Sequence, residues 1–280
     1  MNAKAAEAEL NHGVSMFKKY KNLLGELTRK TVKLKYRNSW LGILWSFFQP
    51  LLNMIVLSVV FAGIFGRHAD GVICYPVYLF SGRIMYEFFV TSTKQAMTAF
   101  RRNAAIIKKV YVPKYMYPLS SIFSTFVTTS ISMLCYVMVW IFFKATGISG
   151  GDGLVFSLHF LFLFVPMFIL LVFSTGVGLI LSVFCVFFRD IEYIWDVIMR
   201  LLMYMLPILY SINRFKGHKL IYIIKYNPLY SMIELFRQCV LSGEWMNPKM
   251  LIYASISAVV MLAVGMAIFN WKSDEIIYHL

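Results

Sequence analysis

Long uncharged segments dominate the hydropathy pattern of the chain. Three of them, at 38–66, 115–143 and 153–188, contain no Asp, Glu, Lys or Arg, and a fourth covers 250–271. Each exceeds or matches the roughly 20 residues that an α-helix needs to cross the hydrocarbon core of a bilayer. Two weaker apolar segments are interrupted by charged residues. The pattern predicts six membrane spans, at 40–66, 72–94, 115–143, 157–188, 195–213 and 250–271.

The composition agrees with a membrane protein. Of the 280 residues, 60% are hydrophobic and only 14% are charged, whereas a soluble domain carries about 25% charged residues. A soluble globular enzyme is therefore excluded. We expect one all-α membrane domain that covers residues 1–280.

The distribution of charge predicts the orientation of the chain. Its formal net charge is +14. If both termini are cytoplasmic, eighteen lysines and arginines lie on the cytoplasmic side and eight on the outer side, as the positive-inside rule requires. This placement weakens the interpretation of the basic charge as a nucleic-acid site. Six of the outer cations lie between spans five and six, so we expect this segment to be more than a simple connecting loop.

An amphipathic helix is predicted before the first span, over 14–36. Its lysines and arginines occupy most positions between apolar residues spaced three and four apart, which suits a helix in the inner headgroup layer. A solvated helix packed on a partner protein is the alternative. The apolar positions are Phe17, Tyr20, Leu24, Leu27, Thr31 and Leu34.

Charged residues inside a predicted span are candidates for function because their burial in the membrane is costly. Arg83 and Glu87 stand four residues apart in span two, on one face of a helix. They are interpreted as an ion pair at a helix contact, as a polar pair facing a pore, or as a proton relay, which is the weakest of the three. His159 lies near the outer surface and is an interfacial residue rather than a relay.

The loop between spans two and three predicts a short helix over 101–112 that stops before Pro113. Two basic pairs flank two isoleucines, a pattern typical of a helix that docks into a cleft of another protein. A basic membrane anchor without a partner is the alternative. The residues concerned are Arg101, Arg102, Ile106, Ile107, Lys108 and Lys109.

Sequence motifs for catalysis are missing. The chain has no G-x-x-x-x-G-K-[ST] phosphate loop and no H-E-x-x-H or G-x-S-x-G motif, and its four cysteines lack metal-binding spacing. We expect no catalytic residue, metal or cofactor in this chain. Energy for transport would come from a partner subunit or an ion gradient.

Several blocks of the sequence resemble one family. The segment YRNSWLGILWSFFQPLLNMIVLSVVF, with Tyr36, Arg37, Trp45 and Pro50, looks like the first span of ABC-2 type transporter permeases that export polysaccharides and teichoic acids. NAAIIKKVYVPKYMYPLS, FFRDI and YNPLYSMIELFRQCVLSG continue the resemblance in the order of the family. Together the blocks cover nearly the whole chain.

The resemblance implies a homodimeric permease in a bacterial cytoplasmic (inner) membrane, driven by two separate ATPase subunits that bind ATP and Mg. It implies that the helix in 101–112 is the coupling helix to those subunits. It also implies a re-entrant cap over 219–243, whose candidate residues are Asn227, Pro228, Glu234 and Arg237.

The cargo implied by the resemblance is a lipid-linked polysaccharide such as an O-antigen, a capsule-like glycan or a teichoic acid. Lys35 and Arg37 are candidates for the lipid diphosphate, with generic contact to anionic lipid as the alternative. A polar glycan needs a channel with hydrogen-bonding groups and flat aromatic faces. Interfacial or lipid-facing positions are the other interpretation of the aromatic candidates, which are Trp45, Phe48, Tyr78, Tyr86, Phe88, Phe89, Tyr204 and Tyr210.

Two other functions remain open from sequence. One is an ABC-2 exporter of a small lipid or drug. The other is an ATP-independent membrane scaffold or ion-coupled carrier.

Overall fold

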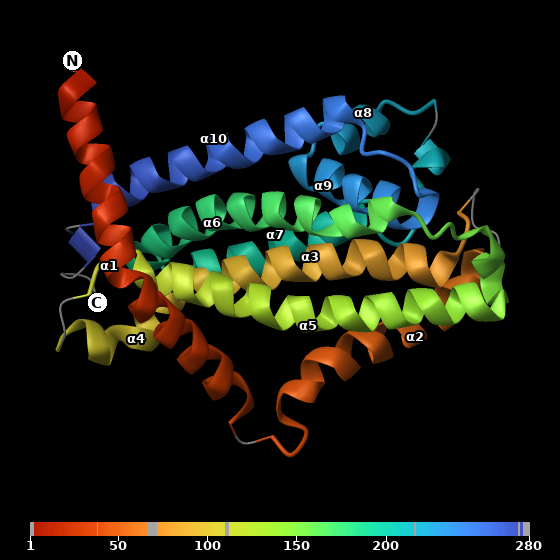
Figure 1. The fold of residues 1–280 in the computed structure, drawn as a ribbon, viewed down its shortest axis with the longest axis horizontal. Helices are drawn as coiled ribbons and strands as arrows, with labels where there is room; N and C mark the ends of the chain where they lie inside the picture. Colours follow the sequence, from red (N-terminus) through yellow and green to blue (C-terminus); the bar gives the residue numbers. More distant parts are fainter. Residues whose placement is uncertain are drawn as a thin grey trace.

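The regular secondary structure of the described residues is entirely helical (Figure 1). The computed structural model describes residues 3–37, 39–65, 72–109, 112–215, 217–273 and 275–276. Short helical turns join or extend the main helices, as η1 (Gly42–Leu44), η3 (Ile148–Gly153), η4 (Leu158–Leu163), η5 (Ile212–Phe215) and the π-turn η6 (Gln238–Ser242). The α-helices are α1 (Ala3–Tyr36), α2 (Trp45–Phe65), α3 (Tyr75–Met97), α4 (Ala99–Ile107), α5 (Met116–Thr146), α6 (Phe164–Phe187), α7 (Ile191–Met205), α8 (Leu220–Lys225), α9 (Pro228–Arg237) and α10 (Pro248–Lys272).

Four helices in the described residues are long and apolar enough to cross a membrane. They cover Gly42–Val60, Met116–Thr146, Leu158–Phe187 and Pro248–Lys272, which overlap four of the six predicted spans. The all-α class is therefore confirmed. The other two predicted spans correspond to α3, which carries polar side chains, and α7, which has only 15 residues.

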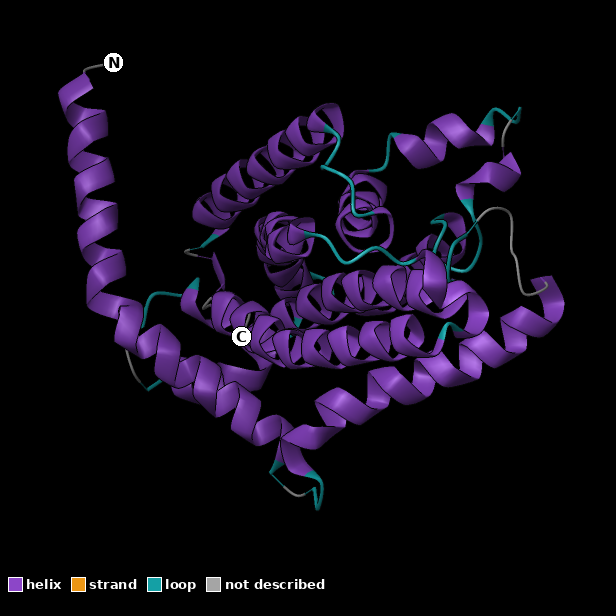
Figure 2. Cartoon of the chain, turned by 45° about the vertical axis from the view of Figure 1, so that its right-hand side comes forward, coloured by secondary structure: helices purple, strands orange, loops and turns teal. Residues whose placement is uncertain are grey.

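The helices α3, α5, α6 and α7 run side by side, and α10 packs along α6 (Figure 1). Helix α9 lies against α3, α6 and α10. Helices α1 and α2 form a V outside this bundle, where both arms contact α5 (Figure 2). We call the end of the bundle at which α3 ends and α5 begins the α4 end.

Glycine allows the close approach of α6 and α10. A Cβ atom at Gly176 would lie 2.3 Å from the carbonyl oxygen of Met261, and one at Gly265 would lie 2.4 Å from the carbonyl oxygen of Gly176. Only residues without a side chain fit at this crossing, as is typical of helix contacts in membranes.

The predicted span 195–213 is not one helix. Helix α7 ends at Met205, and its C-cap Leu206 has extended backbone angles (φ −77°, ψ 141°). Leu206 precedes Pro207, and the residue before a proline is disfavoured in the α conformation. At 1.5 Å per residue, α7 is about 22 Å long, which is less than the hydrocarbon thickness of about 30 Å.

Helix α1 differs from the predicted amphipathic helix in its start, since it begins at Ala3 rather than at residue 14. Its side chains are described from Tyr20 onward. Leu24 is buried, whereas Leu34 is 52% exposed. Part of the apolar face therefore packs on α5, and another part stays open to a lipid or protein surface.

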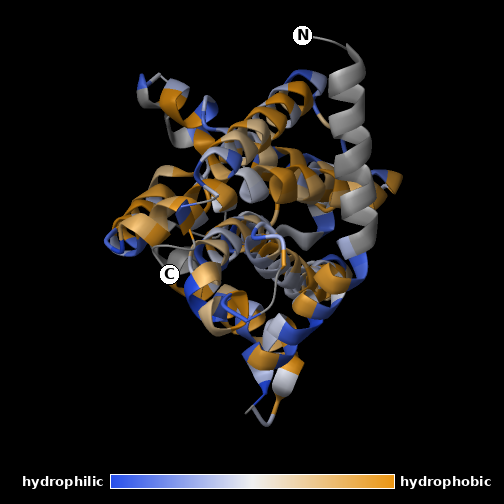
Figure 3. Cartoon of the chain, turned by 90° about the vertical axis from the view of Figure 1, so that its left-hand side faces the viewer, coloured by the Kyte–Doolittle hydropathy of each residue, from blue (hydrophilic) through white to orange (hydrophobic). Residues whose placement is uncertain are grey.

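Seen from the α4 end, apolar residues make up much of the helices (Figure 3). Hydrophilic residues gather at helix ends and connections. Such a distribution is expected of a protein whose helices are surrounded by lipid.

Candidate functional site

A polar chamber lies between α2, α3 and α5. Its volume is about 300 Å³, at the lower end of the range for small-molecule sites. Polar side chains of three helices dominate its lining. They are Ser46, Gln49 and Asn53 of α2, Arg83, Glu87, Thr91 and Gln95 of α3, and Thr125, Thr128, Thr129 and Ser132 of α5; the remaining lining residues are Lys35, Tyr36, Pro50, Phe80 and Ile84.

The stripe on α3 repeats every four residues, from Arg83 through Glu87 and Thr91 to Gln95. This spacing places the four side chains on one helix face. Arg83 Nη2 lies 3.2 Å from Glu87 Oε2, so the two predicted residues form an ion pair within α3. Their side chains are 24% and 52% exposed, and the pair therefore borders an open surface.

The same ion pair also borders a second cavity of about 310 Å³, which we call the α3–α7 groove. Lys94 Nζ lies 2.6 Å from Asp196 Oδ2 in this groove and links the two helices. Arg83 Nη1 approaches the sulfur of Met203 at 3.4 Å. The chamber and the groove thus form one polar surface that runs across α3 from α2 to α7.

The two predicted lipid-entry residues both have exposed side chains, but only one of them lines the polar chamber. Lys35 lines the polar chamber, whereas Arg37 follows the end of α1 with an exposed side chain and is not part of that lining. Lys35 Nζ also lies 5.4 Å from the centre of the Tyr36 ring.

The predicted channel aromatics fall into two groups. Tyr78, Tyr86, Phe88 and Phe89 are buried inside the chain, with exposures of 9%, 5%, 1% and 3%. They pack against neighbouring helices because α3 directs them into the core, although Tyr86 also lines the α3–α7 groove. Surface positions are occupied by Trp45 (41% exposed), Phe48 (40%) and Tyr204 (67%), and Tyr210 is half-buried.

Two buried tyrosines instead bind the irregular backbone that follows α7. Tyr75 donates its hydroxyl hydrogen to the carbonyl oxygen of Leu209 at 2.8 Å. The hydroxyl of Tyr78 lies 3.0 Å from the carbonyl oxygens of Pro207 and Tyr210. Unpaired backbone groups are costly in an apolar environment, so these tyrosines allow α7 to stop inside the bundle.

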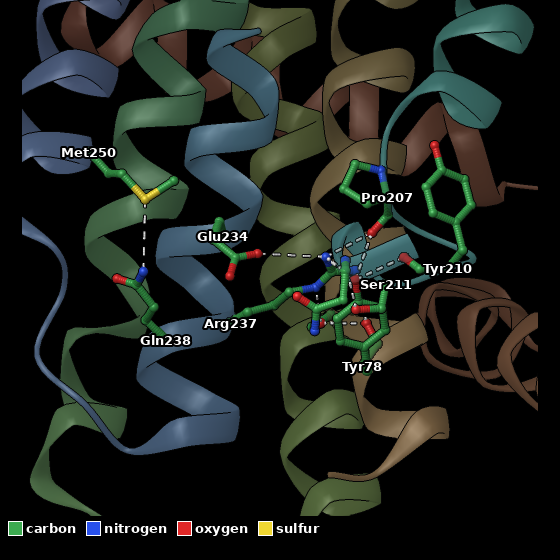
Figure 4. A network of polar contacts seen from close by, with 10 residues as sticks. Tyr78, Pro207, Tyr210, Ser211, Glu234, Arg237, Gln238 and Met250 are labelled. Atoms are coloured by element: carbon green, nitrogen blue, oxygen red, sulfur yellow. Dashed lines mark hydrogen bonds and ion pairs between the residues drawn. The ribbon is translucent and has the colours of Figure 1, made fainter. Parts of the chain in front are cut away.

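Arg237 joins the same network (Figure 4). It is 2% exposed, and its Nη1 atom donates to Tyr78 Oη at 2.9 Å and to the carbonyl oxygen of Pro207 at 2.8 Å. Its Nε atom approaches Ser81 Oγ at 3.3 Å, and Glu234 lies at 3.9 Å. The arginine therefore ties α9 to α3 and to the end of α7.

Helix α9 begins as the local sequence dictates. The side-chain oxygen of Asn227 accepts a hydrogen bond from the backbone nitrogen of Leu229 at 3.0 Å, which caps the helix. Pro228 occupies the first helical turn, where a missing N–H costs nothing. The four residues predicted for the cap thus have structural roles in and beside α9.

The predicted coupling helix corresponds to α4, which ends at Ile107. Arg101 forms an ion pair within the chain, since its Nη2 lies 2.6 Å from Glu192 Oε2 of α7. This hydrogen bond raises the pKa of Arg101 above its ordinary value. Arg102 Nη2 donates to the carbonyl oxygen of Gln95.

The two isoleucines of α4 differ in their surroundings. Ile107 packs against a core cluster that includes Phe100 and Tyr117, whereas Ile106 lies outside that cluster and is half-buried. Lys108 and Lys109 are exposed. Of the two isoleucines, only Ile106 is therefore outside the described core clusters, beside the exposed basic residues.

Sequence reasoning missed the polar chamber and the Arg237 network. The four-residue repeat of polar residues on α3 was a readable signal for the chamber. The contacts of Arg237 had no such signal, because they join residues 159 positions apart.

Comparisons with known proteins identify the family. The family description "ABC-2 type transporter" matches residues 22–241. The chain belongs to the ABC-2 type transporter family. The matched part of this family member includes the polar chamber, α4 and the Arg237 network, and α10 follows it.

Curated relatives of this ABC-2 transporter chain match it along most of their length. An O-antigen export system permease protein RfbA from Klebsiella pneumoniae is 30% identical over 252 residues, covering 89% of this chain and 91% of the relative. One from Myxococcus xanthus is 24% identical, covering 91% and 94%. The polysialic acid transport protein KpsM of Escherichia coli is 23% identical, covering 94% and 98%.

Proposed function

We propose that this chain is the permease subunit of an ATP-driven exporter that moves a lipid-linked polysaccharide across the bacterial inner membrane. The observation that carries the proposal is the match, over most of their length, to permeases named for O-antigen export and polysialic acid transport. The continuous polar surface across α3 supports it. A chain of hydrated sugars needs such a surface to cross the apolar core of a membrane.

In this proposal two copies of the chain face each other across their α2, α3 and α7 helices. One copy leaves Glu87 half-exposed beside Arg83 at mid-length of α3, and a second copy would enclose this surface as a conduit. Among the predicted channel aromatics, Trp45, Phe48 and Tyr204 are exposed, and they are proposed to contact sugar rings. Arg37 is proposed to contact the lipid diphosphate at the membrane surface.

The energy source is proposed to be a pair of ATPase subunits that bind ATP and Mg and dock on α4. The chain itself is then not an enzyme. Both termini and the α4 end would face the cytoplasm, α1 would lie in the inner headgroup layer, and α8 and α9 would form the re-entrant cap before the last of six spans.

A depletion experiment in the native host tests this function. We expect loss of surface polysaccharide when the chain is depleted, together with accumulation of the lipid-linked polymer on the cytoplasmic side. An affinity-purified chain should bring down an ATPase, and replacing the phosphate-loop lysine of that ATPase should produce the same loss of export.

Two outcomes contradict the proposal. Unchanged surface glycan with greater sensitivity to a toxic compound would instead identify an exporter of a small lipid or drug. Transport by the chain alone in vesicles, without nucleotide hydrolysis, would identify an ATP-independent carrier.

A further inference from the structure

The polar chamber contains side chains with unused hydrogen-bonding capacity. Within the described residues, the amides of Gln49 and Asn53 and the hydroxyl of Thr129 make no hydrogen bond to the chain, although all three line the chamber. Gln49 and Asn53 belong to a helix that is long and apolar enough to span a membrane. Polar groups at such positions are costly unless they meet a partner.

The two grooved sides of α5 differ in polarity. The chamber side carries Thr125, Thr128, Thr129 and Ser132. A separate groove on α5 is lined mainly by apolar residues, among them Val127, Ile131 and Leu134, of which Leu134 is 64% exposed. The apolar side suits lipid chains, whereas the chamber offers donors and acceptors to a polar ligand.

The charges of the chamber restrict the ligand further. Its ionisable side chains with formal charge are Lys35, Arg83 and Glu87, and the last two form an ion pair. The lining therefore carries one uncompensated positive charge, on Lys35. A ligand that is rich in neutral hydroxyl or amide groups and carries one anionic end matches this arrangement.

A sugar ring attached to a phosphate has this chemistry. Ring hydroxyls both donate and accept hydrogen bonds, as the side chains of Gln49, Asn53 and Thr129 do. Arg83 and Glu87 add a charged donor and a charged acceptor to the lining, and Tyr36 and Pro50 add apolar surface for ring C–H groups. A phospholipid headgroup would need the cation but not the eleven polar side chains that the three helices contribute.

We propose that the polar chamber binds the sugar ring next to the diphosphate of the lipid-linked cargo, with the phosphate oxygens toward Lys35. This inference rests on the proposed function, because it assigns a docking place to the same substrate. The chamber would hold the first sugar before the polymer enters the conduit along α3.

Binding by the full-length chain in lipid nanodiscs tests the site. The two probes are a polyprenyl diphosphate that carries one N-acetylhexosamine and the same polyprenyl diphosphate without a sugar. We expect the sugar-bearing probe to bind at least about tenfold more tightly. In the variant Asn53→Leu/Thr129→Val, this advantage should disappear, while the affinity for the sugar-free probe stays the same.

Matched variants separate the contribution of the sugar contacts to binding from that of the diphosphate contact. Thr175→Val makes the same chemical change on α6, outside the chamber lining, and should leave both affinities unchanged. Lys35→Gln should weaken both probes by a similar factor, since both carry the diphosphate. If the double variant does not fold, Gln49→Leu replaces it, because Gln49 is exposed and makes no internal hydrogen bond among the described residues.

Equal affinity for the two probes, or a sugar advantage that survives in the chamber variants, overturns the inference. Absence of binding by both probes does so as well. Failure of the site is distinguishable from failure of the function, because depletion of the native chain reports on export independently. If export still depends on the chain but the sugar does not strengthen binding, the chamber proposal is rejected and the proposed function stands.

Discussion

The Arg237 guanidinium carbon lies 3.6 Å from the centre of the Tyr78 ring, while Nη1 of the same guanidinium donates to the Tyr78 hydroxyl at 2.9 Å. One side chain thus makes a cation–π contact and a hydrogen bond with the other. Gly82 makes room for it, since a Cβ atom there would lie 2.5 Å from Nη2 of Arg237. The pair fixes α9 against α3 at the point where the α7 chain breaks.

Replacing this arginine should destabilise the fold. Arg237→Gln leaves the carbonyl of Pro207 and the hydroxyl of Tyr78 without their charged donor in a buried site. We expect a loss of about 2–4 kcal/mol of stability, since a buried polar group that loses its partner bears the desolvation cost. The measurement is thermal unfolding of the purified chain in detergent.

Two further variants check the cause of this loss. Arg237→Lys keeps the charge but not the planar fork, and it should fall between the native chain and Arg237→Gln. Arg29→Gln changes an exposed arginine of α1 and should shift the midpoint little. Equal midpoints for all of these proteins would show that the Arg237 contacts contribute no stability.

The α6–α10 crossing should not tolerate a methyl group. In Gly176→Ala the new Cβ would lie 2.3 Å from the carbonyl oxygen of Met261, so the helices must separate. We expect a loss of about 1–3 kcal/mol. Gly25→Ala is the matched control, because nothing lies within 4 Å of the new atom in α1 and alanine favours a helix by up to about 1 kcal/mol over glycine. Equal destabilisation by both changes would contradict the close crossing.

The pairing of Arg101 with Glu192 predicts that α4 and α7 move together. The pair is exposed enough that its effect on stability is about 0–1 kcal/mol. Reversing one charge, in Arg101→Glu, should therefore lower export several-fold with little change in the melting temperature. The exchange Arg101→Glu/Glu192→Arg should restore export. A double variant no better than the single one would show that Arg101 acts on another partner.

The surface of α4 predicts different results for its two isoleucines. Ile106→Asp should detach the ATPase in a pull-down while the chain stays folded, because Ile106 lies outside the core cluster. Ile107→Asp should also lower the melting temperature by several degrees, since Ile107 packs against that cluster. Retention of the ATPase by a folded Ile106→Asp chain would remove this residue from the interface.

The phosphate contact at the membrane surface has its own test. Arg37→Ala should lower polymer export while leaving insertion of the chain and ATPase binding intact, because Arg37 is exposed and lies outside the bundle core. Export is measured as surface glycan per cell at matched amounts of chain in the membrane. Unchanged export would exclude Arg37 from substrate binding.

The success of the sequence analysis differed between elements for physical reasons. The four most apolar spans were predictable because the bilayer requires long continuous runs of apolar residues. The helix α4 was predictable from its local pattern of charge, but its end was not, since α4 ends at Ile107 rather than directly before Pro113. The break after α7 was missed, although Pro207 is visible in the sequence, because a proline alone does not show whether the freed carbonyls find donors.

Local composition was enough to predict the helical class, the four long apolar helices and the presence of charges in α3, since these features depend on nearby residues and on the solvent. Tertiary structure alone decided that Tyr78 points into the core toward Pro207, that Arg101 pairs with Glu192, and that the polar stripes of α2, α3 and α5 meet in one chamber. These contacts join residues far apart along the chain, and their geometry depends on how the helices pack.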